Sequence, residues 1–458
     1  MSTKRYVVVG GGISGLSACY ALRAKHPAAE IVLLEAQNRM GGVIQTDRHG
    51  GYVLEGGPDS ILRRKPEAVQ LAQAVGLNPI GTNPGARGAY IYQRGRFFDI
   101  PPGVQSGIPT DVWALIQSGL LSWSGKARAS FDFFLPRITQ PDEDIALGRF
   151  LRYRFGDEVV ERLAAPMLSG IYAGDIDQMS MEATFPHFKE LEQTYRSIVQ
   201  GARRTRPPAS PGAGPRPSLF ATFAGGLQSY IDALTASLED VDLRVNTPVI
   251  EVVPAQAGLA EVVTGSETFV ADGVVIAVPA YQAAILLYRT ARMVANVVGA
   301  VSYANLAVIG AVYDGSSEVP SDKTGFLVPR NEGLRMTACT YVSSKWHYPD
   351  VPAGTVLRAY YGRAGEDVLT LGEQDLTALY VKEMHQVLPR LGMPAYLKVF
   401  RQPQAIPQYQ VGHLRKMGAA IQQLRTDCPH VALAGSYVDG VGIPDCVRRA
   451  YAAVDQLG

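Results

Sequence analysis

The sequence has little cysteine, almost no net charge and no long uninterrupted apolar run. Its four cysteines are Cys19, Cys339, Cys428 and Cys446, which are widely separated and form no C-x-x-C pair. This spacing predicts neither a disulfide framework nor a zinc site, and a reducing cytoplasm is the simplest compartment for it. The seven histidines show no metal-ligand spacing either, so we expect no metal.

Charge and hydropathy exclude further classes of protein. The 43 basic residues nearly balance the 42 acidic ones, so no overall field attracts nucleic acid or an acidic membrane surface. The most apolar stretch, at residues 112–123, is interrupted by polar residues and is too short to span a bilayer. A strand is predicted almost at the first residue, so we expect no signal peptide. We therefore expect a soluble, cytoplasmic protein without an integral membrane segment.

The first sixty residues, in contrast, contain a nucleotide-binding pattern. An apolar run at residues 6–9 predicts a buried strand, and a G-x-G-x-x-G pattern follows it directly. Gly10 suits the tight turn, Gly12 would let the backbone approach a pyrophosphate, and Gly15 would let the next helix pack on the strand. The amides at the N-terminus of that helix would face the phosphates.

An acidic residue and a second glycine pair indicate which nucleotide is bound. A second apolar strand, at residues 31–34, ends at Glu35, where a carboxylate would hold the adenosine ribose. The following Arg39-Met40-Gly41-Gly42 looks like the R-x-G-G doublet of two-dinucleotide-binding flavoproteins, in which the arginine and the glycine backbone secure FAD. No second G-x-G-x-x-G follows a later strand, so we expect no NAD(P)H domain. The flavin should be reduced by substrate and reoxidised by an external acceptor.

The rest of the chain alternates between helical and strand-like regions. Residues 110–200 are predicted to be mostly helical, with helices opened by Asp142 to Asp144 and by Asp157, the latter ending before Pro166. The glycine-punctuated segment 168–175 is not expected to continue a helix, and the proline-rich segment 203–218 is expected to be a loop or linker.

Strands are predicted at several later places, and two of them return to the nucleotide domain. Residues 300–362 are strand-like and 373–387 are predicted to form a helix. The apolar runs at 273–278 and 431–435 suit buried strands of the nucleotide domain. After the last of them, the N-terminus of the final helix is expected near the pyrimidine end of the flavin, where its dipole would stabilise negative charge on the reduced ring.

With these residues in place, the chain resembles the protoporphyrinogen oxidase family over its whole length. The matching stretches are residues 10–16, 55–60, 169–175, 223–227, 406–413 and 440–446. Three further stretches look most like the soluble bacterial branch that acts on coproporphyrinogen III; they are residues 107–110, residues 337–340 with Lys345-Trp346, and residues 357–362.

The resemblance implies an α/β fold with three domains. A Rossmann-like nucleotide domain of the p-hydroxybenzoate-hydroxylase type is expected to bind FAD, beside a mixed-sheet substrate domain and a helical domain that binds membranes in membrane-associated relatives. The expected ranges are 1–60, 218–280 and 415–458 for the FAD domain, 61–90, 180–217 and 281–414 for the substrate domain, and 91–179 for the helical domain.

The motifs and the resemblance together give the expected flavin contacts. These are Gly10, Gly11, Gly12, Ile13, Ser14, Gly15, Glu35, Ala36, Arg39, Gly41, Gly42, Val43, Gly57, Pro58, Asp59, Ser60, Val249, Ser436, Val441, Gly442 and Ile443. We expect non-covalent FAD, because Cys446 begins a helix rather than standing in a flavin-linking motif. Relatives often have an aromatic or imidazole side chain where Gln402 stands, which puts a flavin contact there in doubt.

The reaction implied by the resemblance takes six electrons from a porphyrinogen in three two-electron rounds. A methine-bridge hydride goes to the flavin, a pyrrole N–H proton leaves, and oxygen reoxidises the flavin to give hydrogen peroxide. Relatives suggest that the backbone carbonyl of Gly170 steadies the pyrrole N–H groups, although a glycine needed only for its turn explains the sequence equally well. No general base is evident.

Cations soon after the expected flavin loop are the candidate substrate contacts. Arg63, Arg64 and Lys65 could form a solvated face or could meet an anionic substrate, and Lys65 matches a substrate-associated position of the soluble branch. Arg358 is a further candidate. A tetra-anion such as coproporphyrinogen would need such cations at its pocket mouth.

Three alternatives remain open from the sequence. Protoporphyrinogen IX is the nearest alternative substrate. A flavin amine oxidase shares the N-terminal motif, and Lys345-Trp346 superficially suits its flavin-proximal lysine and aromatic cage, but residues 440–446 do not match that family's pattern. A non-enzymatic porphyrin carrier, or an assembly partner of later haem-pathway enzymes, is the third. For the enzyme itself, the resemblance leaves room for a transient contact with the next enzyme of that pathway.

Overall fold

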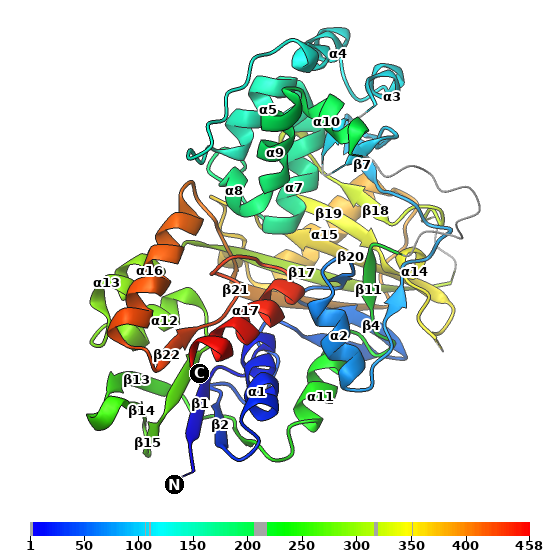
Figure 1. Cartoon of the computed structure of the whole chain (residues 1–458). Coiled ribbons are helices and arrows are strands. Elements are labelled where there is room, and N and C mark those ends of the chain that lie inside the picture. Colours follow the sequence, from blue (N-terminus) through cyan, green and yellow to red (C-terminus); the bar gives the residue numbers. More distant parts are fainter. Residues whose placement is uncertain (1–2, 106, 110, 206–217, 316–318, 350) are drawn as a thin grey trace, which may run out of the picture.

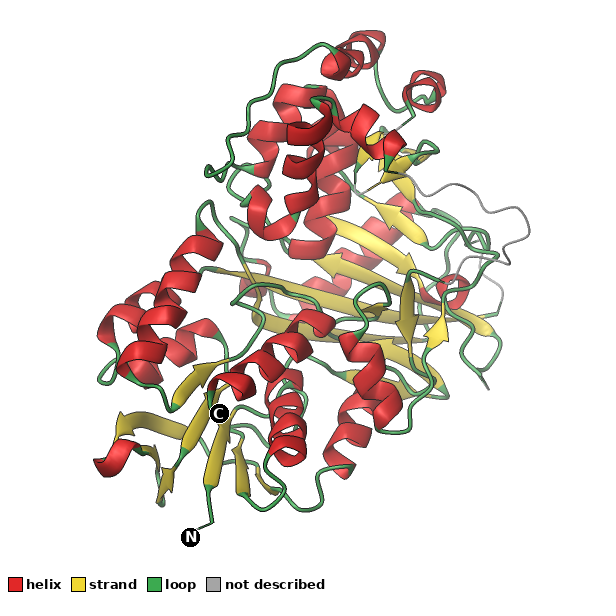
Figure 2. Ribbon diagram, viewed as in Figure 1, coloured by secondary structure: helices red, strands yellow, loops and turns green. Residues whose placement is uncertain are grey.

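The computed structural model describes residues 3–105, 107–109, 111–205, 218–315, 319–349 and 351–458 (Figure 1). Thr110 and most of the predicted loop at 203–218 therefore lie outside the described residues. Helices and strands divide into three regions, with a parallel sheet and its helices at one end, a large mixed sheet in the middle and a group of helices at the other end (Figure 2).

A five-stranded parallel sheet carries the N-terminal motif. Its strand order is β12-β2-β1-β16-β22. The strands are β1 (Arg5–Val9), β2 (Glu30–Leu34), β12 (Asp242–Arg244), β16 (Gly273–Ile276) and β22 (Val431–Leu433). Strand β1 pairs in parallel with β2 and β16, and β22 pairs with β16. The predicted return of the two late apolar strands to the N-terminal unit is thus confirmed.

Both faces of this sheet are covered, which explains its nearly uninterrupted apolar strands. One face packs against α1 (Ile13–Lys25), α2 (Glu67–Ala74), α11 (Gln228–Ala236) and α17 (Ile443–Gln456). The other face packs against the antiparallel strands β13 (Val249–Pro254), β14 (Ala260–Thr264) and β15 (Thr268–Ala271) and the helices α12 (Ala280–Leu287), α13 (Arg292–Gly299) and α16 (His413–Asp427).

The second large sheet is mixed and has seven strands. Its order is β21-β17-β20-β19-β18-β7-β8. The strands are β7 (Tyr90–Gln93), β8 (Arg96–Asp99), β17 (Tyr303–Asp314), β18 (Gly325–Leu327), β19 (Met336–Tyr341), β20 (Gly354–Tyr361) and β21 (Tyr396–Pro407). The predicted helix α15 (Glu373–Val387) packs on one face, and the hairpin β3 (Thr46–His49) and β4 (Tyr52–Glu55) packs on the other with the short helix α14 (Val342–Lys345). Short pairings join β5 (Ile61–Leu62), β6 (Ile80–Gly81) and β11 (Phe220–Thr222), and β9 (Val104–Gln105) with β10 (Ile108–Pro109).

The helical region comprises α3 to α10 around its own apolar core. The helices are α3 (Val112–Gln117), α4 (Trp123–Ser130), α5 (Leu147–Phe155), α6 (Asp157–Val159), α7 (Ala165–Tyr172), α8 (Met181–Thr184), α9 (Pro186–Tyr195) and α10 (Ile198–Arg204). None of the helices in the described residues is long and apolar enough to cross a membrane.

Two expected domain boundaries differ from this arrangement. Residues 181–204, assigned to the substrate domain, belong to the helical region, because Met181, Phe188 and Ile198 are buried in its core. Residues 91–99, assigned to the helical domain, instead belong to β7 and β8, because β7 pairs with β18 of the mixed sheet.

The helix predicted to end before Pro166 in fact continues to Tyr172. A π-helical turn at Val160–Ala164 immediately precedes α7, and the helix runs past Pro166, which has no N–H to donate. Apolar packing of Leu163 and Leu168 in the helical core then holds the extension. The helix expected from Asp142 to Asp144 begins only at Leu147, because the Asp144 carboxylate accepts hydrogen bonds from Ser180 Oγ and Gly412 N instead.

Candidate flavin-binding site

The glycine loop between β1 and α1 has the geometry of a phosphate cradle. Gly10 has φ +106°, and a Cβ on Gly15 would lie 1.8 Å from the Gly10 carbonyl oxygen, so both positions require glycine. At Gly12 the situation is the opposite, since a Cβ there would meet no described protein atom within 4 Å. Gly12 therefore faces open space, where a ligand could approach the backbone.

The N-terminus of α1 is also available to an anion. Its N-cap is Gly12, and neither a capping side chain nor an acidic residue satisfies the first turn of Ile13 to Leu16 among the described residues. Free amides and the helix dipole both favour a negatively charged group at such a position. The residues present thus fit the pyrophosphate of a dinucleotide.

Glu35 lies at the carboxyl end of β2, next to this cradle. Its Oε2 accepts a hydrogen bond from Gly11 N at 2.6 Å and its Oε1 accepts one from Gln37 N at 2.7 Å. The carboxylate is therefore fixed beside the glycine loop while retaining lone pairs for ribose hydroxyls. Val249 begins β13 close by, because Thr247 N donates to the Glu35 carbonyl, and Ala36 directly follows Glu35.

Arg39 contacts the backbone of its own loop. Its guanidinium donates to the carbonyl oxygens of Met40 at 3.1 Å, Ile44 at 3.0 Å and Gly42. These bonds hold the loop in which Gly41 and Gly42 have φ of +115° and +59°, and Gly41 N bonds to the Gly11 carbonyl at 2.8 Å. Arg39 therefore supports the glycine loops, and its contribution to holding FAD stays a prediction. Val43, which follows Gly42, is half exposed.

The loop Gly56 to Ser60, after β4, packs on the same region. A Cβ on Gly57 would lie 2.0 Å from the Val43 carbonyl oxygen, so only glycine fits this contact. Gln402 Nε2 donates to the Gly56 carbonyl at 3.3 Å, so this side chain contacts the loop backbone. The expected contacts Gly57, Pro58, Asp59 and Ser60 are thus adjacent to the glycine cradle.

Arg358 is not at a pocket mouth, which corrects its assignment as a substrate contact. It is 3% exposed, and its guanidinium donates to the Gly57 carbonyl and lies 3.7 Å from Asp59. Lys345 Nζ lies 2.6 Å from the same carboxylate. Arg358 approaches the flavin loop from β20 of the mixed sheet and Lys345 approaches it from the end of α14, and nothing in the local sequence signals these contacts.

The N-terminus of α17 forms a second open helix end beside α1. Its N-cap is Gly442, and the described side chains provide it with no capping hydrogen bond. Ser436 accepts a hydrogen bond from Tyr409 Oη at its carbonyl, and residues 439–442 lead into the helix. Val441, Gly442 and Ile443 stand at this helix end, whose first turn also contains Asp445, and their contact with the flavin stays a prediction.

Of the three clustered cations, Lys65 has a partner that the sequence did not reveal. Its Nζ lies 2.6 and 2.8 Å from the carboxylate oxygens of Asp445 in the first turn of α17, and its side chain remains 43% exposed. Arg64 is exposed, and burial together with the charge of Arg64 lowers the pKa of His187 of α9. Arg63 is partly buried, and its backbone N–H donates to the Leu219 carbonyl. The run therefore lies between α17 and the helical region.

Gly170 lies in the last turn of α7 and is exposed. The following Ala173 has φ +49°, its carbonyl accepts from Ala364 N, and the Tyr172 carbonyl accepts from Gln408 Nε2. The interpretation of Gly170 as a turn glycine is wrong, because the residue is helical. Carbonyls of a last helical turn lack intrahelical partners, so the Gly170 oxygen is suited to accept from a ligand.

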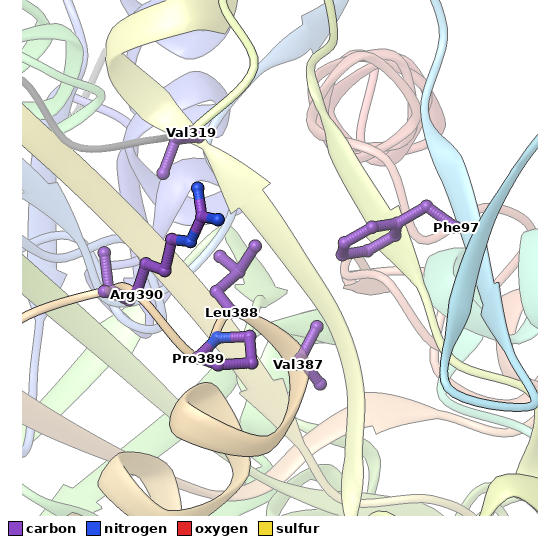
Figure 3. Close-up of a pocket in the computed structure, with 7 residues that line it drawn as sticks. Phe97, Val319, Val387, Leu388, Pro389 and Arg390 are labelled. Atoms are coloured by element: carbon purple, nitrogen blue, oxygen red, sulfur yellow. The ribbon is translucent and has the colours of Figure 1, made fainter.

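A separate pocket of roughly 280 Å³ lies at the end of α15 (Figure 3). Phe97 of β8 stands on one side and Val387 to Arg390 stand on the other. None of its lining residues belongs to the predicted flavin or substrate contacts, so it is not the candidate site.

Comparison with known proteins agrees with this geometry. Residues 13–458 match the flavin containing amine oxidoreductase family. The chain is 36% identical to a coproporphyrinogen III oxidase of Bacillus subtilis (98% of this chain, 97% of the relative) and 32% identical to one of Staphylococcus aureus (99% of each). The crystal structure of a putative protoporphyrinogen oxidase from Exiguobacterium sp. superposes with a TM-score of 0.89 at 34% identity, covering 99% of this chain and 98% of that one. The chain therefore belongs to the flavin-containing amine oxidoreductases and, within them, to the family of the coproporphyrinogen III oxidases.

Proposed function

We propose that this flavoprotein binds FAD non-covalently and oxidises coproporphyrinogen III to coproporphyrin III in the cytoplasm. The substrate loses six hydrogens in three rounds, and three molecules of oxygen are reduced to hydrogen peroxide. The observation that carries the proposal is the open cradle at Gly12 beside two uncapped helix N-termini, in a chain similar to coproporphyrinogen III oxidases over its whole length.

The bound FAD would supply the hydride acceptor, and the protein would supply binding and orientation. The Gly170 carbonyl would accept a hydrogen bond from the pyrrole N–H groups and so orient the macrocycle. The N-terminus of α17, at Gly442 and Ile443, would stabilise negative charge at the pyrimidine end of the cofactor. Arg64 and Lys65, between α17 and the helical region, would meet the propionates. Transient contact with the next haem-pathway enzyme remains a prediction.

Anaerobic flavin reduction tests this function directly. Purified protein is mixed without oxygen with coproporphyrinogen III or with protoporphyrinogen IX, and bleaching of the flavin absorbance is followed. We expect faster bleaching by coproporphyrinogen III in detergent-free buffer, and peroxide formation once air is admitted. Equal or faster bleaching by protoporphyrinogen IX would assign the chain to that substrate, and bleaching by amines alone would support an amine oxidase.

We predict that acid precipitation releases the yellow cofactor into the supernatant. The candidate attachment residue, Cys446, is 6% exposed and is packed in the core between α17 and the parallel sheet. Burial raises the pKa of its thiol to about 12, so the reactive thiolate is not available. Colour that remains with the pellet would contradict non-covalent binding.

Lys65→Ala is predicted to raise KM several-fold for coproporphyrinogen III while changing kcat less. The half-exposed Lys65 would lose an attraction that substrate and transition state share, which is worth roughly 0.2–1 kcal/mol for an exposed pair. The variant also leaves Asp445 without its closest cation. A matched control is Lys25→Ala, because Lys25 pairs with Asp455 near the other end of α17 at 3.1 Å. Equal changes of KM in both variants would argue against a substrate role.

A further inference from the structure

Two cations and one carboxylate meet behind the flavin loop. Lys345 Nζ, at the end of α14, lies 2.6 Å from Asp59 Oδ2, and Arg358 Nη1, on β20, lies 3.7 Å from the same oxygen. Ser60 Oγ donates to Asp59 Oδ1 at 2.7 Å. The side chains of Asp59 and Lys345 are 14% and 15% exposed and that of Arg358 is 4% exposed, so water screens the three charges poorly.

Arg358 is attached directly to the loop backbone, and Asp59 belongs to this loop. Arg358 donates to the Gly57 carbonyl, and Gly57 packs against the Val43 carbonyl beside the glycine cradle. Arg358 Nε is buried and has no hydrogen-bond partner in the described part of the chain, so its charge is incompletely compensated. The cluster therefore includes Asp59 of a segment that, under the proposed function, touches the flavin.

Two other buried ionisable groups near the cluster, Glu55 and Tyr360, have raised pKa values, which favour their neutral forms. Glu55 accepts hydrogen bonds from Leu227 N and Thr46 Oγ1, and burial raises its pKa to about 7. Tyr360 Oη accepts from Arg358 Nη1 at 2.8 Å and is neutral, since burial raises its pKa to about 12. Burial alone would raise the pKa of Asp59, but Lys345 and Arg358 outweigh it and hold that pKa well below its usual range. Lys345 and Arg358 thus hold Asp59 in its anionic form.

We propose that Lys345 and Asp59 are positioning residues that set the reduction potential of the bound flavin in opposite directions. The inference rests on the flavin site of the proposed function but not on its substrate. A buried cation near the ring favours the anionic reduced flavin, and a buried anion disfavours it. The pair therefore balances the potential while it fixes the loop from Gly56 to Ser60.

The test compares flavin midpoint potentials of purified holoproteins, measured by anaerobic equilibration with a redox dye. Lys345→Met should lower the midpoint potential and Asp59→Asn should raise it. Each should change the ratio of reduced to oxidised flavin at a fixed potential about tenfold, which is about 30 mV for a two-electron couple. Lys345→Arg, which keeps the charge, should stay near the unsubstituted protein. Lys323→Met is the matched control, because Lys323 pairs with Asp99 of β8, at the far edge of the mixed sheet.

Opposite shifts are the decisive outcome, because mere loosening of the loop would move both variants in one direction. Shifts of the same sign, no shift, or a shift as large in Lys323→Met would overturn the proposal. If Lys345→Met does not fold with flavin, Lys345→Gln makes the same test while keeping a hydrogen-bond donor for Asp59. The dye titration uses no porphyrinogen. If coproporphyrinogen III is not the substrate, the measured midpoint potentials are therefore unaffected, and the two proposals can fail independently.

Discussion

Gly12→Val is expected to give a folded protein that contains no bound flavin. A Cβ at this position meets no atom of the described protein within 4 Å, so the valine side chain should be accommodated without disturbing β1 or α1. It would, however, project into the open space beside the uncapped N-terminus of α1, where the pyrophosphate would approach the backbone. The flavin-to-protein ratio from the visible and ultraviolet absorbance should fall to near zero, while the far-UV circular dichroism stays unchanged.

Gly15→Ala provides the contrast that separates ligand binding from folding. There a Cβ would lie 1.8 Å from the Gly10 carbonyl oxygen, so the helix would have to move off the strand, and overpacking of this kind costs about 1–3 kcal/mol or more. Gly15→Ala should melt at a lower temperature than the unsubstituted protein from which the flavin has been removed. Gly12→Val should melt at the same temperature as that flavin-free protein. Stoichiometric flavin in purified Gly12→Val would show that the cradle is misplaced.

The parts of the structure that were predicted from the sequence are those whose signals are local. The strand, glycine loop, helix and acidic strand end of the N-terminal unit follow from spacing within about thirty residues, and β1, α1, β2 and Glu35 are found as expected. The helix predicted at 373–387 has the same bounds in the structure, because Gly372 precedes it and its apolar positions follow a helical period. Local backbone rules suffice at these positions.

The errors concern contacts between distant residues, for which one sequence contains no local signal. Lys345 and Asp59 are separated by 286 positions and Lys65 and Asp445 by 380, so neither ion pair could be anticipated from spacing. Arg358 was placed at a pocket mouth because charge alone suggested exposure, whereas the sheet buries it against the Gly57 carbonyl. In α7, tertiary packing and a π-helical turn override the expected helix end at Pro166.

The helical region contains another buried ionic group, and its loss should have the largest effect on stability. Arg154 of α5 and its partners Glu192 and Asp132 have fully buried side chains. Glu192 also accepts from Thr139 N at 2.9 Å, and Asp132 accepts from Ser197 Oγ at 2.5 Å, so the group connects α5, α9 and the start of α10. Removing one partner from such a group leaves uncompensated buried charge, which typically costs about 3–5 kcal/mol.

We therefore expect Arg154→Ala to destabilise the helical region by about 3–5 kcal/mol while the flavin domain keeps its cofactor. Native-state hydrogen exchange should show amides of α5 and α9 exchanging at least roughly a hundredfold faster, since 1.4 kcal/mol corresponds to a factor of ten. Arg152→Ala, two positions away, removes ion pairs to the more exposed Asp157, Glu161 and Asp177 and should cost at most about 1 kcal/mol. Because Gly170 lies in α7 of this region, Arg154→Ala should also raise KM for the porphyrinogen without lowering the flavin content. Unchanged exchange in Arg154→Ala would mean that the buried group does not hold these helices together.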